Sequence, residues 1–287
     1  MEPAKNPTTI PGMGGLPMLA LTAGDGARAD IYLHGAHVTS WIPAGEPVDR
    51  LFVSDRAVFA DDAPIRGGVP VCFPQFADQG PLPLHGFARS TAWQLVRAGA
   101  TADGGAQAHL RFAADDSTRA RWPHAFVLDY VVTVRARTLS LALAVGNPGP
   151  SPFAFTAALH TYLAVADLRA ARIRGLAGAR YRDKVRRIDD VPETAAELAV
   201  DRAIDRVYYA APQDLALVEP SRALAIRADG FVDTVVWNPD SAKSATIPDL
   251  QADGYLRFVC IEAACARAAV PVAAGAVWHG SQTLTAR

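Results

Sequence analysis

Apolar side chains alternate with polar or small ones along most of this chain, and this period of two restricts its fold more than any other feature. In the clearest example, a large apolar residue occupies every second position from 126 to 134. A second series follows from 139 to 145, after a short turn at 136–137. Successive side chains of a strand point to opposite faces. The pattern therefore predicts an antiparallel hairpin with one face in a core.

The same alternation recurs in short runs bounded by Gly, Pro, Asn and Asp, which is typical of strands. Helical periodicity is scarce, and the single candidate, 193–198, is equally compatible with a loop. The further strand candidates are 31–33, 38–42, 51–53, 93–97, 109–112, 153–165, 207–209, 224–226, 234–237, 256–263 and 278–284. Persistent alternation without crossover helices favours an all-β fold, a large antiparallel β-sandwich.

A chain of 287 residues is compatible with one or two domains, and all-β domains of this size are common. The first 28 residues lack the sustained alternation of the rest. We therefore expect a loose N-terminal leader at 1–28, followed by a single β-sandwich domain at 29–287.

The charge balance limits the class of partner. The formal net charge is −1, so the chain has no basic excess with which to hold nucleic acid or a membrane surface. The three cysteines have no repeating metal or redox spacing, which indicates a reducing, cytoplasmic setting. The first ten residues lack the apolar stretch of a secretion signal, and no apolar run reaches transmembrane length.

The stretch from 64 to 93 fits neither a helix nor an ordinary strand. Four of its residues between 67 and 86 are prolines, which disfavour long hydrogen-bonded ladders, yet apolar and aromatic side chains fill the rest. We expect a rigid, irregular, half-buried segment. Because it carries Arg66, His85 and Arg89, it is a candidate site for a small anion. A surface ion pair is the alternative for the two arginines.

Two strands each place an ionisable residue on a suggestive face. In 153–165 the odd positions 153, 155, 157, 159 and 163 are apolar, so His160 points away from the core, over small residues that leave room for a ligand. In 255–263 Glu262 ends an apolar row, where desolvation would raise the pKa of its carboxyl and make it a better base. Each residue also has an ordinary alternative: a structural histidine, and a solvated glutamate at a strand end.

No metal or nucleotide site is indicated. His34 and His37 are three residues apart but lack a third ligand, so a turn with two solvated histidines is favoured. The pair Gly67-Gly68 is not a phosphate loop, because no Gly-Lys-Ser/Thr follows it. We expect no cofactor.

Six motifs together resemble one family. They are Arg-Gly-Gly-Val-Pro-Val-Cys-Phe-Pro-Gln-Phe at 66–76, His-Gly-Phe-Ala-Arg at 85–89 with Trp93, Leu-His-Thr-Tyr at 159–162, Asp-Arg-Val-Tyr at 205–208, Val-Trp-Asn-Pro at 236–239 and Val-Cys-Ile-Glu-Ala at 259–263. In this order the chain resembles the hexose-6-phosphate mutarotases (glucose-6-phosphate 1-epimerases) of the galactose-mutarotase-like superfamily. The resemblance implies a β-supersandwich and a cytoplasmic, cofactor-independent epimerase that acts on a sugar phosphate. We expect a monomer.

The resemblance also implies roles for individual residues. His160 and Glu262 match the family's general acid and base, and Arg66 and Arg89 match its phosphate contacts. Asp205 would bind sugar hydroxyls, and His85 would lie near the ring. Leu84 stands where relatives commonly have Gln, which removes a ligand contact, and Cys265 stands where they often have Asn.

Three alternatives remain open. An aldose 1-epimerase for unphosphorylated sugar would not need Arg66 and Arg89 in its pocket. A non-catalytic sugar-phosphate sensor would have no use for a matched acid and base. A lyase or hydrolase on a related sandwich would need a second carboxylate paired with Glu262, and the sequence offers no recognisable one.

Overall fold

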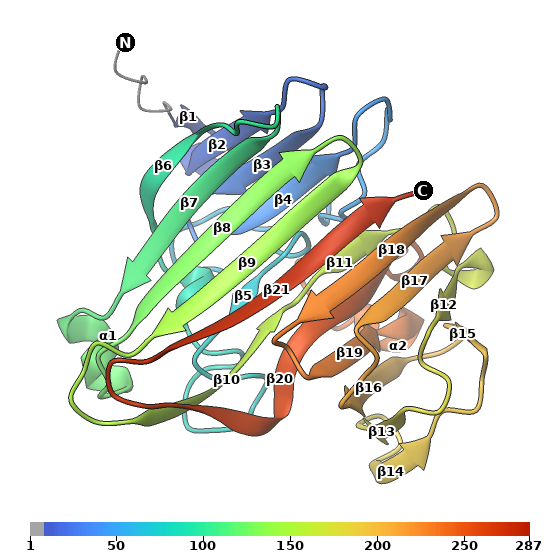
Figure 1. The fold of residues 1–287 in the computed structure, drawn as a ribbon. Helices are drawn as coiled ribbons and strands as arrows, with labels where there is room; N and C mark the ends of the chain where they lie inside the picture. The colour runs from blue at the N-terminus through green and yellow to red at the C-terminus, as the bar shows by residue number, and fades with distance from the viewer. Residues whose placement is uncertain (1–8) are drawn as a thin grey trace.

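The computed structural model describes residues 9–287, which form three antiparallel sheets and very little helix (Figure 1). The four-stranded sheet has the order β1 (Ile10–Pro11), β2 (Pro17–Thr22), β3 (Arg28–Tyr32), β4 (His37–Ile42). The eight-stranded sheet has the order β14 (Ile188–Pro192), β13 (Arg180–Asp183), β16 (Ile204–Tyr209), β19 (Asp233–Asn238), β20 (Phe258–Val272), β10 (Phe153–Leu159), β5 (Val71–Cys72), and β11 (Tyr162–Ala164) also pairs with β20. The nine-stranded sheet has the order β15 (Glu197–Ala199), β12 (Arg172–Arg174), β17 (Asp214–Glu219), β18 (Arg222–Asp229), β21 (Val277–Ala286), β9 (Thr138–Gly146), β8 (Val127–Arg135), β7 (Ala106–Ala113), β6 (Gln94–Ala100).

Helix is limited to short pieces within these residues. They are α1 (Asp116–Arg121), α2 (Asp240–Ser244) and the 3₁₀ turns η1 (Met13–Gly15), η2 (Ala88–Ser90), η3 (Leu168–Ala170) and η4 (Gly254–Leu256). In the part of the chain that the structure describes, no helix is long and apolar enough to traverse a bilayer. The predicted all-β antiparallel fold is therefore confirmed, and the predicted hairpin is β8 with β9, in register from Val127↔Gly146 to Arg135↔Thr138.

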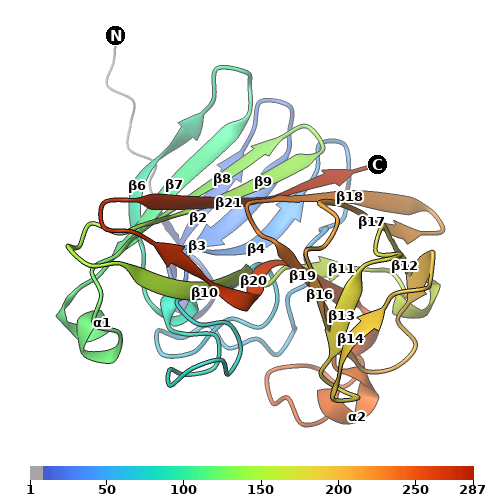
Figure 2. The ribbon, with the colours of Figure 1, turned by 60° about the horizontal axis from the view of Figure 1, so that its bottom comes forward.

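The nine-stranded sheet lies across the other two, and one large apolar core fills the space between the layers (Figure 2). Alternation divides the eight-stranded sheet between this core and its opposite face. On β20, Ile261, Ala263 and Cys265 belong to the main core, whereas Ala264 and Ala266 pack in a smaller cluster on the other face. That second face is the one that the long irregular segment covers.

The segment 64–93 has the character that its sequence predicts. Its only strand is β5, two residues long, which pairs with the end of β10. Residues 67–77 are nevertheless all buried. Phe76 and Ala77 pack on the outer face of the eight-stranded sheet, in the smaller apolar cluster. The irregular backbone thus forms one wall of whatever lies on that face.

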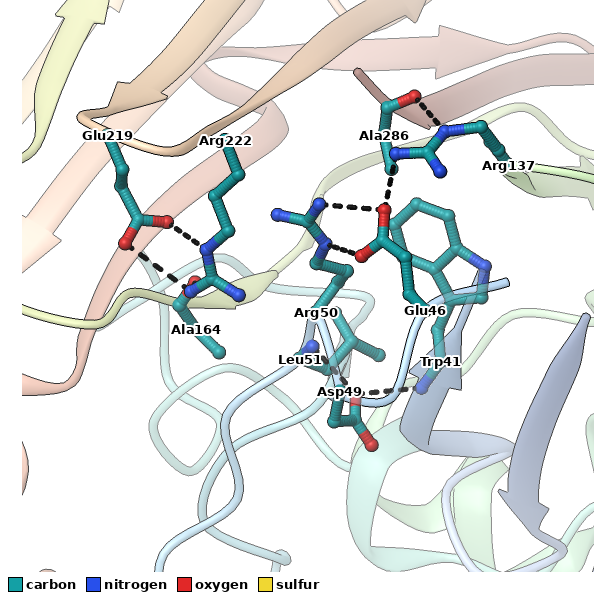
Figure 3. A network of polar contacts seen from close by, with 10 residues as sticks. All are labelled: Trp41, Glu46, Asp49, Arg50, Leu51, Arg137, Ala164, Glu219, Arg222 and Ala286. Atoms are coloured by element: carbon teal, nitrogen blue, oxygen red, sulfur yellow. Dashed lines mark hydrogen bonds and ion pairs between the residues drawn. The ribbon is translucent and has the colours of Figure 1, made fainter. Parts of the chain in front are cut away.

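A network of ion pairs fixes the chain that leads into this segment (Figure 3). Glu46 accepts hydrogen bonds from Arg50 Nε at 2.6 Å and from Arg137, which lies in the turn between β8 and β9. Asp49 accepts one from the backbone N–H of Trp41 on β4, at 2.9 Å. The segment is therefore tied at its start to both the four-stranded and the nine-stranded sheets.

The expectation of a loose leader at 1–28 was wrong for the part that the structure describes; residues 1–8 lie outside it. β2 pairs with β3 from Met18 to Thr22, and Leu19 and Leu21 point into the main core. The alternation here covers only six residues and follows a glycine-rich stretch, which masks it in the sequence. In the candidate helix at 193–198, residues 193–196 form a loop, the second of the two alternatives, and residues 197–198 begin β15.

Candidate active site

One pocket of about 350 Å³ on the outer face of the eight-stranded sheet brings together side chains from distant parts of the chain. Binding pockets for small molecules commonly have volumes of about 300–1,000 Å³. All six residues predicted from the sequence line it: Arg66, His85, Arg89, His160, Asp205 and Glu262. The structure therefore assembles the whole predicted set around one hollow.

The histidine and the glutamate lie side by side at its base. His160 Nε2 is 3.3 Å from Glu262 Oε1, and the two residues are only 7% and 1% exposed. His160 follows β10 and Glu262 lies in the middle of β20, not at a strand end. His160 Nδ1 and Glu262 Oε2 have no hydrogen-bond partner in the described chain. Buried polar atoms are nearly always paired, so these two are available for a ligand.

A buried amide behind the pair fixes its spacing. Gln282 on β21, 1% exposed, accepts a hydrogen bond from the hydroxyl of Thr161, the residue after His160. Its Nε2 donates to the carbonyl of Ile261, the residue before Glu262, at 3.0 Å. Thus one side chain from the nine-stranded sheet holds the backbone beside both ionisable residues.

Burial favours the neutral form of both groups. It raises the pKa of Glu262 well above its ordinary value, and the nearby Asp205 raises it further. It also lowers the pKa of His160 to about 3, with a further lowering by Arg89 and Arg66. These shifts favour the neutral imidazole and oppose ionisation of the Glu262 carboxyl, so a proton shared by the pair favours Glu262 over His160.

Cations line the rim. Arg66 donates to Asp249 at 3.1 Å and to the Tyr162 hydroxyl at 3.2 Å, which fixes its guanidinium. Arg89 donates to the backbone carbonyl of Leu84 at 2.9 Å. Lys243, from α2, adds a third positive charge to the lining. Arginine presents several N–H donors in a planar fork, so both guanidinium groups keep donors for an anion.

Asp205 and His85 occupy the remaining walls. Asp205 lies 3.3 Å from the Lys184 ammonium, and burial raises the pKa of its carboxyl in spite of that lysine. His85 has a positive φ of 67° and accepts a hydrogen bond from the Ala77 N–H through Nδ1, at 3.2 Å. Burial lowers the pKa of His85, with His160 as the next cause. Its ring centroid is 5.3 Å from that of His160.

The two departures from the resemblance have different consequences. Leu84 lines the pocket and is 58% exposed, so an apolar side chain does stand at the mouth, where the resemblance implies an amide. Cys265 is on the core-facing side of β20 and is fully buried, so it does not contact the pocket.

The expectation of two solvated histidines was wrong. His34 and His37 are buried, and each places Nε2 against a backbone carbonyl, that of Ala63 at 2.8 Å and that of Gly67 at 2.7 Å. They therefore brace the start of the irregular segment. Burial lowers the pKa of His37 to about 3, which keeps the ring neutral.

Sequence reasoning missed two cations of the lining, Lys184 and Lys243. A signal was present. The chain contains three lysines, Lys5, Lys184 and Lys243, among 28 basic residues, so arginine serves almost everywhere else. Lysine carries a compact, strongly hydrated charge that arginine does not replace. Two of the three lysines line this pocket.

One group of donors could hold a metal ion. His160, Cys260 and Glu262 each offer one ligand atom, and these atoms lie within 4.8 Å of one another. Nitrogen, sulfur and carboxylate oxygen suit a zinc-like cation. Such an ion would occupy the same lone pairs that make the histidine and the glutamate available for proton transfer.

Comparison with known proteins links this geometry to a family. A family model described as aldose 1-epimerase matches residues 17–285. A protein of Cenchrus ciliaris is 32% identical over 284 residues, which cover 95% of this chain and 85% of that protein. One from Escherichia coli (strain K12) is 36% identical over 247 residues, which cover 83% and 80%. Both are named "Putative glucose-6-phosphate 1-epimerase".

A solved structure gives the same match in space. The crystal structure of a "putative mutarotase" from Salmonella typhimurium superposes with a TM-score of 0.88 at 30% identity, covering 96% of this chain and 92% of that one. The galactose-mutarotase-like fold that the motifs imply is therefore confirmed.

The raised pKa of Glu262 predicts a pH-dependent cost in stability. The folded chain holds this proton more tightly than the unfolded chain, whose glutamates titrate near 4.5, so the free energy of unfolding falls as pH rises above about 4.5. Glutamine cannot ionise. We expect Glu262→Gln to match the native chain in thermal stability near pH 4 and to exceed it increasingly up to pH 8. Glu197→Gln, at an exposed position on β15, should show no such growing gain. If the melting temperatures of Glu262→Gln and the native chain differed by the same amount at pH 4 and at pH 8, the result would contradict the expectation.

The Gln282 bridge predicts a coupled loss of stability. Gln282→Leu removes the partner of the Ile261 carbonyl and leaves the Thr161 hydroxyl only its long 3.4 Å contact with the Leu159 carbonyl, and each weakened buried group costs about 1–3 kcal/mol. Adding Thr161→Val to it should cost less than the sum of the two single changes, as measured by denaturant unfolding in a double-mutant cycle. The matched control is Gln107→Leu, since Gln107 donates to Thr133 on the neighbouring strand in a less buried position. Strictly additive losses would show that Gln282 and Thr161 act independently.

Proposed function

This chain belongs to the aldose 1-epimerase family, as its motifs predict, and we propose that it interconverts the α and β anomers of a hexose 6-phosphate, with glucose 6-phosphate as the first candidate. The observation that carries the proposal is the pair of His160 Nε2 and Glu262 Oε1, 3.3 Å apart, at the base of a pocket with a cationic rim.

Anomer exchange needs one acid and one base close together. The hydroxyl oxygen on C1 and the ring oxygen are both bonded to C1, so the two groups that serve them must be neighbours. In the proposed reaction Glu262 removes the proton from the C1 hydroxyl, C1 becomes a carbonyl, and the bond from C1 to the ring oxygen breaks. The ring oxygen takes a proton from His160. After rotation about C1–C2, the reverse steps close the ring on the other face.

The phosphate of the substrate prepares the pair for these roles. Glu262 acts as a base only after its proton has moved to His160. Arg89 and Arg66 oppose this, because both lower the pKa of His160. A phosphate dianion between the two arginines offsets their charge and so raises that pKa. Substrate binding thereby helps the imidazole to carry the proton that the ring oxygen requires.

The cationic rim favours a phosphorylated sugar over a free one. Arg66, Arg89 and Lys243 present three positive charges around a pocket whose buried glutamate has a raised pKa and so resists ionisation. Guanidinium groups bind phosphate through charge-assisted hydrogen bonds. Arg66 already pairs with Asp249, but Arg89 and Lys243 have no carboxylate partner in the described chain, and an unphosphorylated sugar would supply none. Anchoring the phosphate also leaves the C1 end free to rotate, which the reaction needs.

The unpaired atoms of His160 and Glu262 argue against a pure binding protein. Burying an ionisable pair whose atoms lack hydrogen-bond partners costs free energy. A protein that only binds the sugar phosphate would gain nothing in return for that cost. Asp205, with Lys184, is proposed to bind sugar hydroxyls, and His85 to contact the ring.

The cellular location, the oligomeric state and the need for a cofactor are also part of the proposal. We keep a cytoplasmic location, which the three free, buried cysteines support. We also keep a monomer that takes a small sugar phosphate and needs no cofactor.

Removing either proton-transfer group tests the proposed roles. General acid–base groups contribute on the order of 10²- to 10⁴-fold, so Glu262→Gln and His160→Ala should each slow anomer exchange of glucose 6-phosphate at least about tenfold while the ligand still binds. Saturation-transfer NMR measures the exchange, and calorimetry measures the binding. Cys265→Ala, on the core-facing side of β20, is the control and should keep the rate constant. Undiminished exchange in either variant would refute its assigned role.

Removing either arginine tests the substrate class. A hydrogen bond to a charged group contributes about 1.5–3 kcal/mol, so Arg66→Ala or Arg89→Ala should raise KM for glucose 6-phosphate about tenfold or more. KM for free glucose should change far less. Arg97→Ala on β6 removes one exposed charge far from the pocket and should alter neither value. Equal losses for both sugars would point to the unphosphorylated substrate.

A further inference from the structure

A second, larger hollow continues from the pocket along the same sheet. Its volume is about 660 Å³, against about 350 Å³ for the pocket itself. Phe76, Asp78 and Lys184 line both, so the two spaces adjoin. Nothing in the proposed anomerisation of a hexose 6-phosphate uses this additional space.

The strands that build the pocket also build the floor of the hollow. On β16, Asp205 lies in the pocket, and Val207 and Tyr209, on the same face, line the hollow. On β20, Glu262 lies in the pocket and Ala266, four residues later on the same face, lines the hollow. The small alanine side chain leaves this face open. Pocket and hollow therefore form one groove across β13, β16, β19 and β20, which are neighbours in the sheet (Figure 2).

The walls of the hollow are predominantly cationic. Four basic residues face two carboxylates, Asp78 and Asp189; the basic residues are Arg182, Lys184, Arg187 and Arg267. Asp189 already accepts hydrogen bonds from the Tyr209 hydroxyl at 2.5 Å and from the Asp190 N–H at 2.8 Å. Lys184 pairs with Asp205 in the pocket, and the three arginines still outnumber the two carboxylates of the hollow.

The arginines differ in how they are held. Arg267 lies over the ring of Tyr209, with Cζ 3.9 Å from the ring centroid, which positions it without using its N–H donors. Arg182 and Arg187 make no side-chain hydrogen bond or ion pair with the residues that the structure describes. Their donors remain free for a ligand. Lys184 stands at the junction of the two spaces.

We propose that the hollow binds the second anionic group of a ligand whose sugar occupies the pocket, so that the groove holds a hexose bisphosphate more tightly than a hexose monophosphate. Arg66 and Lys243 line only the pocket, whereas Arg182, Arg187 and Arg267 line only the hollow. The cations of the pocket would bind one phosphate of a sugar, and the cations of the hollow, on the other side of Lys184, would bind the second. This inference rests on the proposed function, because it takes the sugar and the first phosphate from it.

The chemistry of the bisphosphate gives it a definite effect. In an aldohexose 1,6-bisphosphate the C1 oxygen is esterified. It carries no hydroxyl proton for a base to remove, so the ring cannot open. Such a ligand would bind without being converted. It would therefore act as a competitive inhibitor of anomer exchange, and the groove would make the activity sensitive to the concentration of doubly phosphorylated sugars.

The experiment compares two ligands on three forms of the full chain. Calorimetry gives Kd for glucose 6-phosphate and for glucose 1,6-bisphosphate, and saturation-transfer NMR gives the inhibition constant of the bisphosphate against exchange of glucose 6-phosphate. The forms are the native chain, the double variant Arg182→Ala/Arg267→Ala, and Arg97→Ala as a control that removes one distant charge. The native chain should bind the bisphosphate at least about tenfold more tightly than the monophosphate. The double variant should lose most of this preference while its kcat and KM for glucose 6-phosphate stay unchanged, and Arg97→Ala should keep the preference.

Two results would overturn the inference. The first is equal affinity of the native chain for both ligands. The second is a double variant whose affinity for both ligands falls by the same factor, because the two arginines would then act only through their general charge. Failure of the proposed function looks different. In that case the native chain would not speed the exchange of glucose 6-phosphate at all.

Discussion

The register of the eight-stranded sheet is the constraint on which the site depends. On β20 the side chains alternate between the main core and the outer face, so a slip of one residue would bury Glu262 among apolar side chains and turn Ile261 outward. The pairing of Val235 with Glu262 and of Trp237 with Cys260 fixes that register from one side. Gln282 fixes it from behind, through the carbonyl of Ile261 and the hydroxyl of Thr161. The distance between the imidazole and the carboxylate is therefore set by backbone pairing and not by contact between the two side chains.

Burial shifts the pKa values of the histidine and the glutamate, and it also costs free energy. A carboxyl and an imidazole in water would titrate near their ordinary values and compete with solvent for every proton. Enclosed by the outer face of the sheet and the irregular segment, both prefer their neutral forms because of burial, and the charges of Arg89 and Arg66 further lower the pKa of His160. The irregular segment is held in turn by His34 and His37 and by the ion pairs around Glu46. Much of the buried polar structure away from the site thus supports the wall that carries its cations.

Much of this arrangement could be predicted from the sequence, because period-two alternation is a local property. Alternation placed His160 away from the core and Glu262 at the end of an apolar row, and the spacing of prolines indicated the irregular wall. Other features depend on contacts between distant segments. The bridge from Gln282 joins residues far apart in the chain, so no window of sequence reveals it. The short alternation of β2 was masked by the glycines before it. The histidines at 34 and 37 resembled a solvated turn because the carbonyls that receive them lie about thirty residues away.

The placement of lysine has a chemical consequence. Ring opening of an aldose produces a free aldehyde, and aldehydes condense with primary amines to form imines, whereas guanidinium groups do not react in this way under mild conditions. Of the three lysines in the chain, Lys184 and Lys243 line the pocket where that aldehyde would form. Arginine carries nearly all the remaining positive charge. A protein that repeatedly generates open-chain sugar therefore offers very few lysines for its own glycation, and two of them line the pocket in which the aldehyde would form.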